Sequence, residues 1–121
     1  MKIEGRGKLL KIYIGETDQY HGSPLYHAIV VKARQLGLAG ATVYRGLEGF
    51  GADSRIHTAN ILRLSEDLPI VVEIVDKPER IDSFLPELDK MVNKGLVVTV
   101  DDVQVVRYAP EKSPQAVSGS K

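Results

Sequence analysis

Histidine and carboxylate side chains are the residues of this sequence that could carry acid–base or metal chemistry. Cysteine is absent, which excludes thiol catalysis, thiolate metal sites and disulfides. The three histidines, His21, His27 and His57, lack the compact spacing, such as His-x-x-x-His, that brings metal ligands together on one element. Surface or hydrogen-bonded histidines are therefore favoured. A small enzyme or metal-binding protein remains the alternative, with a dispersed site built from four residues: Asp18, His21, Asp53 and His57.

A second polar group lies in the long segment 51–67, between two predicted strands. This connection is far longer than a hairpin turn, and such loops in compact domains are usually functional or disordered. Arg55 is its strongest candidate anchor, because a planar guanidinium can bind a carboxylate or phosphate through two hydrogen bonds. A merely solvated loop is the alternative. We interpret four residues of the segment as a partner-binding set: Asp53, Ser54, Arg55 and His57.

Alternation of apolar side chains predicts the strands that would position these groups. In 8–15, Leu10, Ile12 and Ile14 share one face, the period-two pattern of a strand with one buried side. Asp101-Asp102 breaks the alternation of the last predicted strand, which indicates a bulge or tight bend. Four strands are predicted in all: 8–15, a short run within 39–51, 68–76 and 96–108.

Apolar residues at helical spacing predict one helix before segment 51–67. Ser23 is suited to cap it with its hydroxyl, and Pro24 fits the first helical position. Gly37 provides the stop. The predicted buried stripe consists of Leu25, Ile29, Val30, Ala33 and Leu36.

A second helix is predicted to begin at Pro78 and to end at Asn93-Lys94-Gly95. Pro86 interrupts it, so we expect a kink or two short pieces near Leu85. Its predicted buried stripe consists of Ile81, Phe84, Leu85, Leu88 and Val92.

Composition describes an ordinary globular chain of 121 residues, with 43% apolar and 26% charged residues. Sixteen basic residues balance sixteen acidic ones, so no overall field recruits nucleic acid. No run approaches the roughly 18 apolar residues that span a bilayer. We therefore expect a cytoplasmic protein with one domain over residues 1–108 and a disordered tail over 109–121.

The order of the elements predicts the fold class. Strand, helix, strand, strand, helix, strand is the βαββαβ plan of ferredoxin-like α+β domains, with both helices on one face of a four-stranded antiparallel sheet. The other face would stay uncovered. Because that apolar face exceeds what a monomer normally exposes, we expect copies of the chain to associate through it. Five residues are expected there: Leu9, Tyr13, Tyr44, Val71 and Val75.

At this point separate blocks of residues carry a family likeness. The Gly49-Phe50-Gly51 run at the start of the long loop resembles the T-loop entry of PII nitrogen-regulatory signalling proteins. A closer resemblance, over about 9–108, is to the PII-like family called domain of unknown function 190. Four blocks carry it in order and spacing: Ile12-Tyr13-Ile14-Gly15-Glu16, Gly22-Ser23-Pro24-Leu25-Tyr26, Gly40-Ala41-Thr42-Val43-Tyr44-Arg45-Gly46 and Ser54-Arg55-Ile56-His57.

The resemblance implies a homotrimeric regulatory protein rather than an enzyme, without a resident cofactor. In PII proteins adenine nucleotides lie in clefts between subunits, and the T-loop engages a partner, which for some relatives is a membrane transport protein or channel. Glycines flanking Phe50 would let backbone N–H groups approach phosphate. Carried over by position, the ligand-binding candidates are Gly49, Phe50, Gly51, Lys94 and Arg107.

Two departures from the PII pattern weaken the nucleotide expectation. The basic, glycine-rich phosphate loop of that family is reduced to Asn93-Lys94-Gly95, and Ala52 stands where a basic residue follows the Gly-Phe-Gly run. Much of the charge that would hold phosphate is therefore missing. Whether the ligand is a nucleotide stays open at this stage.

Overall fold

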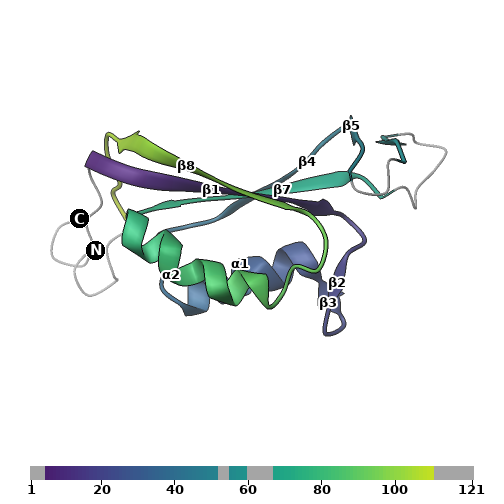
Figure 1. Ribbon diagram of the computed structural model, residues 1–121, viewed down its shortest axis with the longest axis horizontal. Coiled ribbons are helices and arrows are strands. Elements are labelled where there is room, and N and C mark those ends of the chain that lie inside the picture. The colour runs from purple at the N-terminus through teal and green to yellow at the C-terminus, as the bar shows by residue number, and fades with distance from the viewer. Residues whose placement is uncertain (1–4, 52–54, 60–66, 111–121) are drawn as a thin grey trace, which may run out of the picture.

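A four-stranded antiparallel sheet with two helices on one face forms the body of the molecule (Figure 1). The computed structural model describes residues 5–51, 55–59 and 67–110. In the sheet the strand order is β4-β7-β1-β8, which confirms the predicted ferredoxin-like fold. The sheet and helix bounds are β1 (Gly5–Gly15), α1 (Leu25–Gln35), β4 (Thr42–Arg45), β7 (Pro69–Asp76), α2 (Pro78–Asp89) and β8 (Leu96–Val105).

Two short hairpins complete the described structure. β2 (Gln19–Tyr20) pairs with β3 (Ser23–Pro24), and β5 (Glu48–Gly49) pairs with β6 (His57–Thr58). The first lies below the sheet beside α1, and the second extends beyond the start of β7 (Figure 1). Neither helix is long and apolar enough to cross a membrane, among the residues described.

The core lies between the sheet and the two helices, as the alternation predicted. Leu10 and Ile12 of β1 are fully buried, and α1 and α2 cover them with most of the residues expected at helical spacing. Leu36 is the exception, because it follows the last residue of α1 and is 48% exposed rather than buried. Burying a large aliphatic side chain contributes about 1.5–3 kcal/mol, so this layer is the main source of stability. The core residues supplied by the helices include Leu25, Ile29, Ala33, Ile81, Phe84 and Leu88.

One buried carboxylate, Asp76 at the end of β7, joins three parts of this layer. It accepts hydrogen bonds from the backbone N–H of Ala39 at 2.9 Å and of Lys77 at 2.7 Å, and from Arg80 Nε at 3.1 Å. Arg80 also donates to the carbonyl of Gly37. The side chain of Asp76 is fully buried, and these donors offset the cost of burying its charge.

The predicted serine cap of the first helix is wrong. Ser23 pairs with Tyr20 in the β2–β3 hairpin, and Pro24 is the N-cap residue without a side-chain cap hydrogen bond. The amide of Leu25 donates instead to the backbone carbonyl of Asp18 at 2.8 Å. A tertiary contact therefore replaces the local cap.

The second helix differs from the prediction at two points. It continues unbroken through Pro86, and it ends at Asp89 rather than at 93–95. Pro86 is exposed, as is Asp82 four residues before it, so the carbonyl that loses its amide partner can face water. The stop follows from a turn at Met91 and Val92, whose N–H groups both donate to the carbonyl of Leu88.

Gly95 is required for a different reason than the predicted helix stop. Its φ is +140°, and a Cβ there would lie 2.6 Å from the carbonyl oxygen of Tyr13. Glycine at this position lets the chain pass close against β1 before β8 begins.

The predicted bulge at Asp101-Asp102 is confirmed. The β1–β8 register pairs Gly7 with Val103 but Leu9 with Val100, and Asp102 has a φ of +57°. Other predictions lie outside the described residues: those for the loop residues Asp53 and Ser54, and for the tail from residue 111 onward.

Candidate functional site

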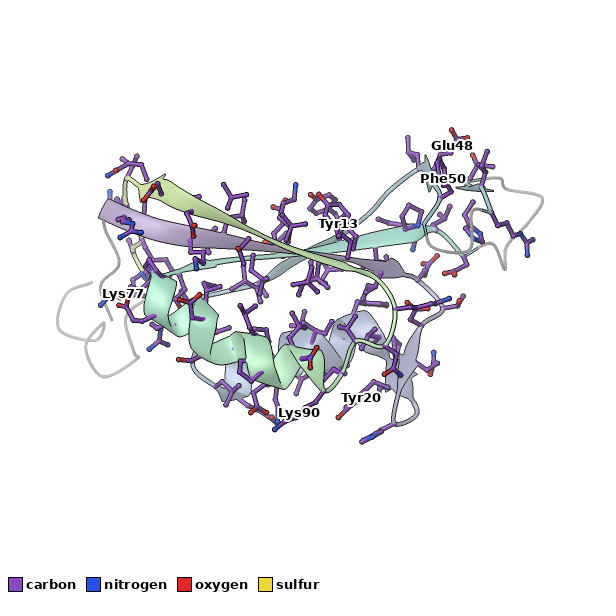
Figure 2. All side chains as sticks on the ribbon, in the orientation of Figure 1. Tyr13, Tyr20, Glu48, Phe50, Lys77 and Lys90 are labelled. Atoms are coloured by element: carbon purple, nitrogen blue, oxygen red, sulfur yellow. The ribbon has the colours of Figure 1, made fainter. Side chains whose placement is uncertain are left out.

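The face of the sheet away from the helices carries the predicted apolar residues. Tyr13, Val71 and Tyr44 lie side by side in register across β1, β7 and β4. Tyr13 is 36% and Tyr44 43% exposed, whereas Val71 between them is buried. Figure 2 shows Tyr13 pointing away from the helix layer. Leu9 and Val75 form a second apolar pair on the same face.

A charged pair separates these two apolar rows. Lys11 Nζ lies 3.4 Å from Glu73 Oε2 and 5.6 Å from the centre of the Tyr13 ring, and the Tyr44 hydroxyl donates to Glu73 at 2.7 Å. Hydrogen bonding with Tyr13 is the main cause that raises the pKa of Lys11. The hydrogen bond to Glu73 is the main cause that raises the pKa of Tyr44. This cluster is the polar centre of the uncovered face.

A cavity of about 380 Å³ lies at one end of that face, where β1 ends and β7 begins. Segment 46–51 after β4 and the turn before β8 form its other walls. Figure 2 places Glu48 and Phe50 at this end of the molecule. The cavity is lined by Tyr13, Ile14, Gly15, Asp18, Gly46, Glu48, Gly49, Phe50, Gly51, His57, Asp67, Pro69, Val71, Lys94 and Gly95.

Four of the five predicted ligand-binding residues meet in this cavity: Gly49, Phe50, Gly51 and Lys94. Arg107 does not join them within one chain. It lines a separate hollow together with Glu73, Val75 and Tyr108, and the Tyr108 hydroxyl donates to the carbonyl of Ala39 at 2.8 Å. Because Glu73 and Val75 belong to the uncovered face, both hollows border the same surface.

The predicted partner-binding residues are only partly described. Arg55 is exposed, and His57 is half-buried in β6 and lines the cavity. The ladder between β5 and β6 pairs Gly49 with His57, which ties the base of segment 51–67 to the cavity wall.

Three carboxylates among the described residues line the cavity, and the sequence predicted only Asp18 as a candidate site residue, as part of the alternative acid–base or metal set. Asp67 accepts a hydrogen bond from the Thr17 N–H at 2.8 Å, and Asp18 accepts one from the Gly15 N–H at 2.9 Å. Lys94 Nζ lies 4.0 Å from Asp18 Oδ1. Asp67 and Glu48 carried no local signal, because no motif marks them and only the fold brings them to the cavity.

The alternative acid–base or metal set is not gathered in the described structure. Asp18 and His57 line the cavity, whereas His21 lies at the tip of the β2–β3 hairpin, stacked on Tyr20 with 4.0 Å between ring centres. His21 borders another hollow with His27 of α1. Within the described residues, no three histidine, aspartate or glutamate side chains are placed to hold one metal ion. Asp53 lies outside the described ranges.

The two glycines around Phe50 are not required by the backbone itself. A Cβ at Gly51 would meet nothing within 4 Å, and one at Gly49 would meet only the Pro69 ring, at 3.3 Å. Neither has a positive φ. The structure therefore leaves open space beside Gly51, on this wall of the cavity, for a group that approaches the backbone.

Fold and cavity together define a ferredoxin-like domain with a hollow beside its open sheet face, and comparison with known proteins identifies its family. Residues 7–105 match DUF190, described as "Uncharacterized ACR", and the chain belongs to that family. A UPF0166 protein of Aquifex aeolicus (strain VF5) is 39% identical over 99 residues, which cover 82% of this chain and 92% of that protein.

Solved structures of PII proteins share the fold. The structure titled CPII bound to ADP and bicarbonate, from Thiomonas intermedia K12, has a TM-score of 0.56 at 19% identity and covers 84% of this chain and 90% of that one. The B. subtilis GlnK–ATP complex has a TM-score of 0.53 at 11% identity, covering 82% and 84%. The predicted resemblance to PII-like DUF190 proteins is confirmed.

Proposed function

We propose that this protein is a cytoplasmic, PII-like regulatory protein and not an enzyme. It binds a small ligand, with an adenine nucleotide or nucleoside as the first candidate, in clefts between the subunits of a homotrimer. Ligand binding changes the conformation of segment 51–67, which presents Asp53, Ser54, Arg55 and His57 to a partner protein. A membrane transport protein or channel is the proposed kind of partner.

The position of the cavity is the observation that carries this proposal. Tyr13 and Val71 belong both to the cavity wall and to the uncovered sheet face. A second copy packed on that face would therefore close the open side of the cavity. The same cavity is lined by Gly49 and Gly51 at the base of segment 51–67, so a bound ligand could act on both the assembly and the segment.

Arg107 fits the same arrangement as a residue supplied by the neighbouring copy. Its hollow includes Glu73 and Val75 of the uncovered face but none of the cavity residues. Rotation of three copies about a common axis would bring different ends of the face together, because the interfaces of a cyclic trimer are head-to-tail. The neighbour's Arg107 would then offset negative charge on the ligand.

Exposed apolar side chains beside the cavity support the proposed partner surface. Leu47 is 78%, Phe50 70% and Ile56 62% exposed, and all three lie on or next to the β5–β6 hairpin. Clustered exposed apolar side chains are typical of sites that bind another protein. Arg55 next to Ile56 would add a charged anchor for a carboxylate of the partner.

Native mass spectrometry and titration calorimetry test the proposal. We expect a trimer, heat on titration with at least one of ATP, ADP, AMP and cyclic AMP, and loss of that heat in Phe50→Ala. Lys94→Ala should weaken binding of phosphate-bearing ligands, with Lys90→Ala as the matched control. Lys90 pairs with Glu87 at 3.4 Å in the helix layer, away from the cavity (Figure 2).

Two results would contradict the proposal. A chain that stays monomeric at micromolar concentration would leave the cavity open, and the inter-subunit cleft would not exist. If no adenine compound produces heat and none co-purifies with the protein, the proposal that the cleft binds an adenine compound is wrong. Gly51→Ala tests ligand binding without disturbing the fold, because the added methyl group meets no neighbour in the described structure.

A further inference from the structure

The fixed charges around the cavity are mostly negative. Among the residues that the structure describes, three carboxylates line it, those of Asp18, Glu48 and Asp67, against one lysine, Lys94. Lys94 already lies 4.0 Å from Asp18, and its own side chain is 65% exposed. Part of its positive charge is therefore offset by a carboxylate of the protein.

We propose that the cavity selects a planar, amino-bearing aromatic ligand of low negative charge, a nucleoside or nucleoside monophosphate, over a nucleoside polyphosphate. This inference rests on the proposed function, because it names the ligand class of the same site. A site built for a triphosphate would show the opposite preference among these ligands.

The walls suit the ring part of such a ligand. Tyr13, Phe50 and Pro69 contribute flat or apolar surfaces to the lining of the cavity. Stacking of a nucleobase on aromatic side chains is a general mode of recognition and tolerates different bases. The carboxylates supply hydrogen-bond acceptors, which match an exocyclic amino group, and an amino group is a donor that phosphate lacks.

The same carboxylates oppose a chain of phosphates. Each added phosphate brings at least one further negative charge into a cavity where, in the described part of the chain, three carboxylates face one lysine. If a neighbouring copy contributes Arg107, these described carboxylates still outnumber the described cations by three to two. Backbone N–H groups near Gly49 and Gly51 can hold one phosphate, but they cannot neutralise several.

Titration calorimetry with adenosine, AMP, ADP and ATP, on the full chain at low salt, tests this selectivity. We expect AMP and adenosine to bind within about threefold of each other, and Kd to rise by about threefold or more for each phosphate beyond the first. Raising the salt from about 50 to 500 mM should reduce the differences in Kd among the four compounds, because salt screens partly exposed charges.

Charge-removing variants assign the effect to the cavity. Glu48→Gln and Asp67→Asn each keep the shape of the side chain, and the amide oxygen introduced by Asp67→Asn can still accept the Thr17 N–H, so the fold should persist. Each should tighten ATP binding relative to adenosine by about threefold or more, whatever the change in adenosine binding itself. The control is Glu79→Gln, at an exposed position of α2 outside the cavity. It changes the net charge by the same amount and should leave the Kd values of the four compounds unchanged.

The outcomes separate this inference from the function on which it rests. ATP binding tighter than AMP, with no gain in Glu48→Gln or Asp67→Asn, overturns the selectivity while the ligand-binding regulator stands. Absence of binding by all four compounds removes both. An equal gain in Glu79→Gln also overturns the inference, because the effect would then come from net charge and not from the cavity.

Discussion

The two faces of the same sheet have opposite roles, although they alternate residue by residue along β1. Ile12 is fully buried under the helices, and its neighbour Tyr13 is 36% exposed on the other side. The covered face is continuous and apolar, with Asp76 as its one buried charge among the described residues. The open face carries the Lys11–Glu73 pair and borders the cavity. One face holds the fold together, and the other is the face through which we propose assembly and ligand binding.

Removal of the Asp76 carboxylate, buried on the covered face, should cause the largest loss in the free energy of unfolding. Asp76→Ala leaves the Ala39 and Lys77 amides and Arg80 without their acceptor, which should cost about 3–5 kcal/mol in the free energy of unfolding. Urea denaturation measures it. Asp89→Ala, at an exposed position of α2, is the control and should stay within about 0.5 kcal/mol of wild type.

The neighbouring pair Ile12 and Tyr13 tests the contrast between the faces directly. Ile12→Ala should lower the free energy of unfolding by about 3 kcal/mol through lost burial and a residual cavity. Tyr13→Ala should cost clearly less in fold stability but impair assembly and ligand binding. Denaturation at several protein concentrations, with native mass spectrometry, measures both. Equal losses of fold stability from the two variants would remove the distinction between the faces.

Gly95 lines the cavity and also lies close against the backbone of β1, so it belongs to both the proposed site and the fold. Gly95→Ala should destabilise the fold by about 2 kcal/mol, because φ is positive and the new Cβ meets the Tyr13 carbonyl at 2.6 Å. Thermal unfolding should show a lowered Tm. Gly40→Ala has open space around the added methyl group and is the matched control. A tolerated Gly95→Ala would mean that this close approach relaxes readily.

The smallest effect concerns alkaline pH on the open face. The pKa values of Lys11 and Tyr44 are raised above their ordinary 10.5 and 10.0, so the folded state favours their protonated forms. Their contribution to stability is fully present below pH 10 and is lost as pH rises through the folded pKa. We expect stability to fall in this range, and to fall less steeply in Tyr44→Phe. Urea midpoints between pH 9 and 11 measure it, and an unchanged slope in Tyr44→Phe would contradict it.

Much of the fold could be predicted from local pattern, whereas the site could be predicted only in part. Alternation identified the buried row of β1 and the open row beside it, because the side-chain period of a strand is fixed by its backbone. The Gly-Phe-Gly run and Lys94 were found through a family likeness, and the cavity gathers them. Asp67 and Glu48 were missed, since acidic residues in a polar segment have no distinctive spacing.

Local rules failed where a tertiary contact replaced a local one. Ser23 has the chemistry of a helix cap, but the Asp18 carbonyl takes the amide of Leu25 and leaves Ser23 to a hairpin. Gly95 looked like a helix stop, but its conformation serves the approach to β1. In both cases the residue type was informative and its partner lay elsewhere.

The sequence by itself determined the order of the elements and the apolar side of the first and third main strands and of both helices, because periodicity and chain order depend on neighbours along the backbone. Only the tertiary structure decided that the end of β1, segment 46–51, Asp67 and Lys94 enclose one cavity, and that Arg107 lies apart from it. The physical reason is that a cavity and its charge balance arise from distances between segments far apart in the chain, which no local pattern encodes.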